Sequence, residues 1–166
     1  MTIERELSIT FGYIVESFSA LFSLIDRFNI FSAAEGLAEC NFSNIREKSV
    51  SRMMKNWSKD VSKYFESNNE KPVTVENIKF PDQYDTAIKD FSKRLEDFIN
   101  TEVNSYLENV RTELLKNQEN EIVSQCLNMI IEALTRKQKY LLDFQKLINE
   151  RFPEQSSVSE SDIRRQ

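Results

Sequence analysis

The feature that most constrains the fold is a long interruption between two helical stretches. Residues 70–81 read Glu-Lys-Pro-Val-Thr-Val-Glu-Asn-Ile-Lys-Phe-Pro, with Pro72 and Pro81 near the ends. Proline lacks a backbone N–H and does not continue a helix interior. The residues between the two prolines are rich in β-branched side chains, which favour an extended backbone. A connection this long can travel the length of a helical bundle, so we expect an all-α bundle of four helices in which the second and third helices run parallel.

Four stretches have apolar residues at steps of three and four, the period of an amphipathic helix. The first turn is predicted at residues 33–36, where Gly36 breaks the pattern, and another is predicted at residues 117–120. Each stretch has about 30 residues and would be about 45 Å long. We expect residues 1–152 to form the bundle and residues 153–166, which are almost devoid of apolar side chains, to be a disordered tail. The predicted helices are residues 2–31, 37–67, 82–116 and 121–151, with Ile122, Cys126 and Met129 among the inward-facing positions of the last.

Composition excludes several kinds of chemistry. The chain has no histidine, which removes histidine-dependent nucleophilic catalysis and histidine-ligated zinc. The net charge of −5 argues against a general nucleic-acid coat. Cys40 and Cys126 are expected to be small buried residues in a reducing compartment. We find neither a run of about 20 apolar residues nor a signal peptide, and therefore expect a cytoplasmic protein without a membrane span.

Three segments resemble the ferritin family. They are Ile-Val-Glu-Ser-Phe-Ser-Ala at residues 14–20, Tyr64-Phe65 together with residues 71–81, and Lys-Asn-Gln-Glu at residues 116–119. The resemblance covers about residues 7–150 and implies a ferritin-like four-helix bundle with one long crossover. It also implies a hollow cytoplasmic homo-oligomer of as many as 24 subunits that stores iron as a mineral core, and a di-iron site that oxidises ferrous iron.

The di-iron site that the resemblance implies is mostly missing from this chain. Two irons need several carboxylates and an imidazole facing one another. Only Glu16 matches a ligand, because Met54 and Trp57 stand where the family has a Glu-x-x-His pair. The third-helix position could shift from Asn100 to Asp97 or Glu102, and Glu132 lies beside the fourth-helix position. The implied ligand positions are therefore Glu16, Met54, Trp57, Asn100 and Ala133.

We accordingly expect no intact di-iron centre and no strong ferroxidase activity of the subunit itself, with Glu16 and Glu132 as the remaining metal-ligand candidates. Iron would then enter already oxidised, or would depend on a catalytic partner subunit. For Glu16 the favoured alternative is a partly buried acid paired with a basic side chain from another helix, since buried charges are normally paired. Met53, Met54 and Trp57 could simply be core residues.

Basic residues recur at steps of three and four along the second predicted helix and so share one side of it. This basic face consists of Lys48, Arg52, Lys55, Lys59 and Lys63. It suggests an alternative function, a non-catalytic cage or scaffold that binds phosphate or other polyanions, including nucleic acid. The face could also be an ordinary solvated surface, and the chain could be an isolated helical interaction module. Glu119 and Glu121 could line an ion channel or be exposed turn residues.

Overall fold

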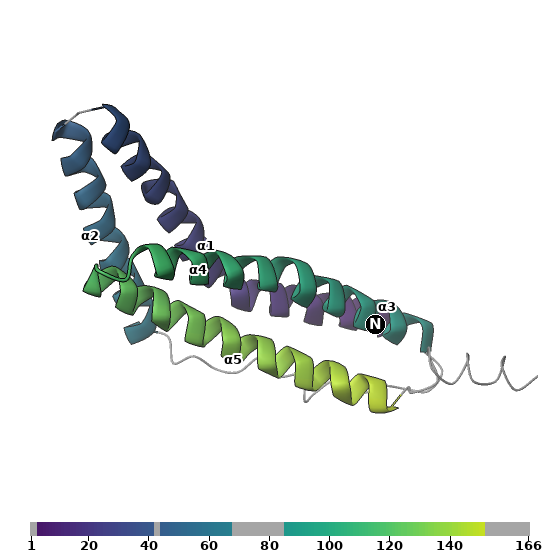
Figure 1. Cartoon of the computed structure of the whole chain (residues 1–166). Helices are drawn as coiled ribbons and strands as arrows, with labels where there is room; N and C mark the ends of the chain where they lie inside the picture. The colour runs from purple at the N-terminus through teal and green to yellow at the C-terminus, as the bar shows by residue number, and fades with distance from the viewer. Residues whose placement is uncertain (1–2, 42–43, 68–84, 152–166) are drawn as a thin grey trace, which may run out of the picture. The chain divides into compact units, whose positions relative to one another are not determined.

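The computed structural model describes residues 3–41, 44–67 and 85–151, and these are helical except for one turn. Side chains are described for residues 4–33, 51–67 and 86–150. The all-α prediction is confirmed for the described residues, in which no strand occurs. The elements in Figure 1 are α1 (Ile3–Asn41), α2 (Asn44–Ser67), α3 (Asp85–Asp97), the π-helix η2 (Phe98–Val103), α4 (Asn104–Lys116) and α5 (Glu121–Arg151). The predicted crossover around residues 70–81 and the predicted tail at residues 153–166 lie outside the described residues.

The predicted turn at residues 33–36 is wrong, because α1 continues through Gly36 to Asn41. A single glycine inside a helix costs only about 1 kcal/mol relative to alanine. The neighbouring sequence Ala33-Ala34-Glu35 and Leu37-Ala38 consists of strong helix formers, which outweigh this cost. The turn at residues 117–120 and the helix ends at Ser67, Lys116 and Arg151 agree with the prediction.

The third predicted helix is one continuous helical run made of α3, η2 and α4. The π-helical segment, which the sequence pattern did not indicate, places Phe98, Ile99 and Val103 in the core. The Thr101 hydroxyl donates to the Asp97 carbonyl within this segment. Such wide turns insert an extra residue and rotate the following side chains around the helix axis.

The chain divides into two compact units, and α1 and α5 each contribute to both. The first unit comprises Met1–Ser17, Pro72–Asn104 and Arg136–Gln166, and the second comprises Phe18–Lys71 and Ser105–Thr135. In the first unit an aromatic cluster joins the three helical segments. The Phe91 ring meets the rings of Phe11 and Phe144 edge-on at 6.4 and 5.9 Å, and the Arg94 guanidinium lies 4.3 Å from the centre of the Phe11 ring.

In the second unit, contacts between side chains fix the directions of the helices. Along α1, Phe22 stacks on Tyr106 and Ser32 donates to Glu113, so α1 and α4 run parallel. Trp57 of α2 packs on Phe28 and Phe31 of α1. Asp60 lies further along α2, but it pairs with Arg27, which lies earlier along α1 than both phenylalanines. Helix α2 therefore runs antiparallel to α1 and, in consequence, antiparallel to α4.

The prediction that the second and third helices run parallel is thus wrong for α2 and α4. The length of the interruption after α2 is compatible with either direction, and hydrophobic periodicity carries no information about direction. The all-α class stands, whereas the arrangement in the second unit is up-down-up-down.

Helix α1 contains one stretch, Glu4–Ala33, that is long and apolar enough to cross a membrane by length and composition. The core helix of a soluble protein meets the same criteria. Ile14, Phe18, Leu21, Ile25 and Phe28 on this helix are all at most 2% exposed. The expected absence of a membrane span and the cytoplasmic location stay predictions.

Candidate anion-binding face

Within the second unit, helix α2 packs against α1 through one side. Trp57 is 1% exposed and Val61 is fully buried. The Trp57 indole N–H donates to the Leu24 carbonyl of α1 at 2.7 Å, and the Arg27–Asp60 ion pair joins the same two helices at the surface. A packed indole with a satisfied N–H fixes the rotation of a helix about its axis, because both the ring contacts and the hydrogen bond depend on it.

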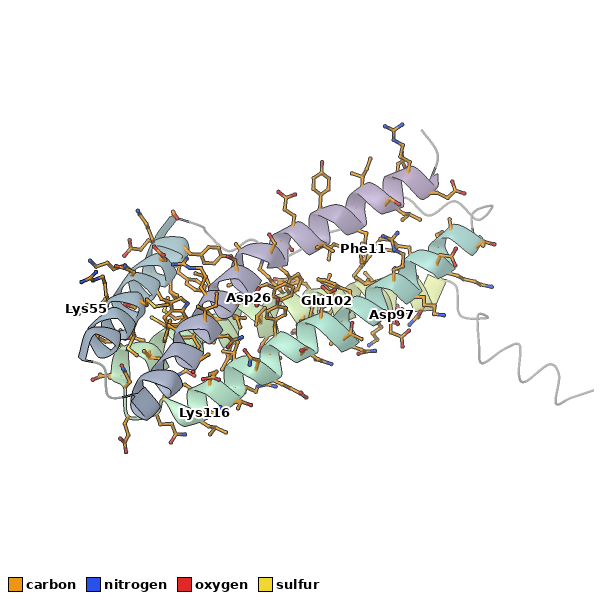
Figure 2. All side chains as sticks on the ribbon, turned by 90° about the horizontal axis from the view of Figure 1, so that it is seen from above. Phe11, Asp26, Lys55, Asp97, Glu102 and Lys116 are labelled. Atoms are coloured by element: carbon orange, nitrogen blue, oxygen red, sulfur yellow. The ribbon has the colours of Figure 1, made fainter. Side chains whose placement is uncertain are left out.

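The side of α2 opposite this anchor carries the basic face. At about 100° per residue, Arg52, Lys55, Lys59 and Lys63 lie within an arc of about 80° centred opposite Trp57 and Val61. All four basic side chains are exposed, and Lys55 projects from the outer side of α2 in Figure 2. They span 11 residues, or about 16 Å. The side chain of Lys48, the fifth member of the face, is not among those described.

The charge of this helix is opposite in sign to that of the chain. Helix α2 contains six basic and three acidic residues, giving it a net charge of +3. The chain as a whole has a net charge of −5. One of the three acids, Asp60, is paired with Arg27, which offsets its negative charge. A row of exposed cations on an acidic protein attracts anions locally.

The positions implied by the ferritin resemblance lie in both units and are described unit by unit. In the first unit Glu16 is exposed, which contradicts the expectation of a partly buried acid. Asn100 is exposed, as are Asp97 and Glu102, the two alternatives for its register, because the core positions of η2 are Phe98, Ile99 and Val103. Figure 2 marks Asp97 and Glu102 on this run.

In the second unit the predicted core role of Trp57 is confirmed, and Ala133 is fully buried. Met53 and Met54 are half-buried, and the Met54 sulfur lies 3.3 Å from the side-chain amide nitrogen of Asn120 at the turn before α5. Glu132 is exposed. Among the described side chains, no three Cys, Asp or Glu residues lie close enough to hold a metal ion together. Glu119 and Glu121 are exposed at the turn.

Cys126 is buried, as predicted, and burial raises the pKa of its thiol above the ordinary value. Ile122, which the pattern placed inward, is instead 63% exposed. It occupies the first turn of α5, where the stripe of buried residues only begins at Val123.

Two buried charged residues were not singled out from the sequence. Glu113 is 8% exposed, accepts a hydrogen bond from the Ser32 hydroxyl at 3.3 Å, and lies 3.7 Å from the Lys116 ammonium. Lys137 in the first unit is 5% exposed. Their positions in the sequence could have indicated burial. Glu113 lies three residues after the core residue Val110, and Lys137 lies three residues after the core residue Leu134.

Comparisons of this chain with protein-family models, with curated proteins and with solved structures gave no match.

Proposed function

We propose that this protein is a non-catalytic helical binding protein that binds phosphate-rich polyanions through the basic face of α2. The observation that supports the proposal is the row of four exposed cations, Arg52, Lys55, Lys59 and Lys63, opposite the anchored side of the helix. Steps of three and four residues along a helix place neighbouring charges about 5–6 Å apart. Several cations spaced in this way can contact successive phosphates of one chain at once.

Binding would be electrostatic and independent of sequence. Each phosphate that a basic side chain neutralises releases condensed counterions, so affinity falls steeply as salt rises. The overall charge of −5 opposes the approach of a polyanion elsewhere on the surface, which favours binding at this face alone. The protein contributes position and charge, and no bond is made or broken.

The test is binding of a fluorescent single-stranded oligonucleotide and of labelled polyphosphate at 50 mM salt, followed by anisotropy. The variant changes Arg52, Lys55, Lys59 and Lys63 to glutamine. The matched control changes one arginine and three lysines that are equally exposed on other helices, Lys93, Arg111, Lys139 and Lys146. We expect the first variant to lose at least a hundredfold in affinity and the control less than threefold. Equal losses in the two variants, or no binding by the unmodified protein, would refute the proposal.

Iron storage in a hollow homo-oligomer, with or without a catalytic partner subunit, stays a prediction from the family resemblance. It requires purified particles, sized in the same experiment, to contain many irons per subunit by elemental analysis. It also predicts no fast coloured intermediate when ferrous iron and oxygen are mixed with the protein. A monomeric mass near 19.5 kDa in light scattering would exclude the oligomer.

A further inference from the structure

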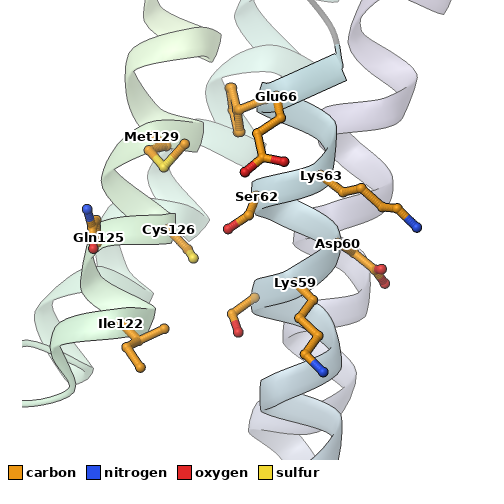
Figure 3. Close-up of a pocket in the computed structure, with 11 residues that line it drawn as sticks. Lys59, Asp60, Ser62, Lys63, Glu66, Ile122, Gln125, Cys126 and Met129 are labelled. Carbon is orange, nitrogen blue, oxygen red and sulfur yellow. The ribbon is translucent and has the colours of Figure 1, made fainter.

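A groove of about 780 Å³ lies between α2 and the first half of α5, within the second unit (Figure 3). Its length is set by the residues at its ends. Ser58 and Glu66 on α2 are eight residues apart, which corresponds to about 12 Å along a helix. Its volume lies within the range of about 300–1,000 Å³ that is usual for small-molecule sites.

The two walls of the groove differ in chemistry. The α5 wall presents Ile122, Cys126 and Met129, and their side chains point toward the gap in Figure 3. Ile122 is 63% exposed, so a large apolar side chain stands uncovered at the mouth of a cavity. The α2 wall is mostly polar and charged, and it consists of Ser58, Lys59, Asp60, Ser62, Lys63 and Glu66 together with Phe65. One largely apolar wall facing one polar and charged wall suits a ligand that is itself amphiphilic.

The charges around the groove are unevenly placed. Lys59 lies at the end near Ile122, and Glu66 lies at the opposite end near Met129 (Figure 3). Asp60 also borders the groove, but its carboxylate is paired with Arg27 of α1. Lys63 also borders the groove close to Glu66, but its side chain points away from α5 in Figure 3. Lys59 is therefore the cation at the end away from Glu66, and an anionic group would be held there.

The length of the groove sets the size of the ligand that it can hold. About 12 Å accommodates only two turns of helix, which offers two or three anchoring side chains. Helix-in-groove recognition uses anchors at i, i+3 or i+4, and i+7, which span about 10.5 Å, so the choice of ligand rests on the cationic side chain opposite the apolar wall and not on length alone. An extended hydrocarbon chain advances about 1.25 Å per carbon, given C–C bonds of about 1.5 Å, so about ten carbons fill the same length.

We propose that this groove binds a medium-chain anionic amphiphile, with its anionic group at Lys59 and its hydrocarbon chain along Ile122, Cys126 and Met129. The hydrocarbon chain of the ligand would cover Ile122 and Met129, and the hydrophobic effect would supply most of the binding free energy. The exposed ion pair at Lys59 would fix the orientation and add a smaller contribution. The site does not depend on polyanion binding, because its apolar wall belongs to α5.

The test is calorimetric titration of the full chain with decanoate below its micelle concentration. We expect saturable binding of one decanoate per chain. Butyrate, which has the same headgroup and a short chain, should not bind, and decyltrimethylammonium, which has the opposite charge, should bind at least fivefold more weakly. These two ligands separate the contribution of the hydrocarbon chain to the affinity from that of the charged headgroup.

Matched variants locate the site. Ile122→Asn should weaken decanoate binding about tenfold or more, whereas Leu147→Asn, on the same helix and 62% exposed, should leave it unchanged. Lys59→Gln should weaken binding about three- to fivefold, and Lys55→Gln, one turn earlier and outside the groove, should not. Failure of polyanion binding would leave these results untouched. Absence of saturable decanoate binding, equal effects of the two asparagine variants, or equal binding of the cationic amphiphile would overturn the proposal.

Discussion

Trp57 is the residue on which the presentation of the basic face most depends, and its removal should be costly. The side chain is 1% exposed, its ring centre lies 4.8 Å from that of Phe28 and 5.7 Å from that of Phe31, and its N–H donates to the Leu24 carbonyl at 2.7 Å. Trp57→Phe keeps an aromatic ring but loses the hydrogen bond, worth about 1 kcal/mol, and some ring volume. We therefore expect a loss of about 1–2 kcal/mol in the free energy of unfolding.

Trp57→Ala removes the aromatic contacts as well and leaves a cavity, for which the expected loss is about 3–5 kcal/mol. The assay is urea denaturation followed by circular dichroism at 222 nm, which does not depend on tryptophan emission and so serves all variants of a chain with one tryptophan. The control is Tyr13→Ala, an aromatic residue that is 67% exposed and should change stability by no more than about 0.5 kcal/mol. A Trp57→Ala loss no larger than that of Tyr13→Ala would refute the assignment of Trp57 as the anchor of α2.

Three further predictions follow from the ion pair and the buried thiol of the second unit. Asp60→Asn should reduce the free energy of unfolding by less than about 1 kcal/mol in urea denaturation, because both partners of the Arg27–Asp60 pair are more than 40% exposed; a loss above 2 kcal/mol would contradict this. Burial covers the Cys126 thiol and raises its pKa, so in a Cys40→Ser background iodoacetamide should react with it more slowly at pH 8 in the folded than in the urea-unfolded protein. Equal rates would contradict this. Since the folded state then holds the thiol proton more tightly, this thiol's contribution to stability should be complete below about pH 9 and fall as pH rises further, which urea titrations at pH 8 and pH 10 would show.

Hydrophobic periodicity predicted the helical class and most helix ends. Apolar residues at steps of three and four lie on one side of a helix, and that side is the one that is buried. Trp57 and Cys126 were placed in the core for this reason, and they are buried. The turn at Gly36 was predicted incorrectly because one glycine was given more weight than the helix formers around it. The direction of α2 relative to α4 was also wrong, since it is decided by contacts between distant segments.

The basic face could be predicted from the sequence because all its residues belong to one helix, and their spacing alone places them on the same side. Glu16 was expected to be partly buried because it lies in a largely apolar stretch, yet it is exposed, since a step of two residues from the buried Ile14 rotates it away from the core. The groove beside α2 could not be predicted, since it is formed by two helices far apart in the chain. Ile122 was the one available sign, and the periodic pattern placed it inside.

The most direct test of polyanion binding by the basic face of α2 is the salt dependence of oligonucleotide affinity. Four phosphate contacts predict a slope of log K against log salt of about −2.8 for a single strand, which is about fiftyfold between 50 and 200 mM. Arg52→Gln combined with Lys55→Gln should reduce the slope to about −1.4, whereas Lys139→Gln combined with Lys146→Gln should leave it at about −2.8. Identical slopes for these two double variants would contradict the claim that the cations of α2 bind the polyanion.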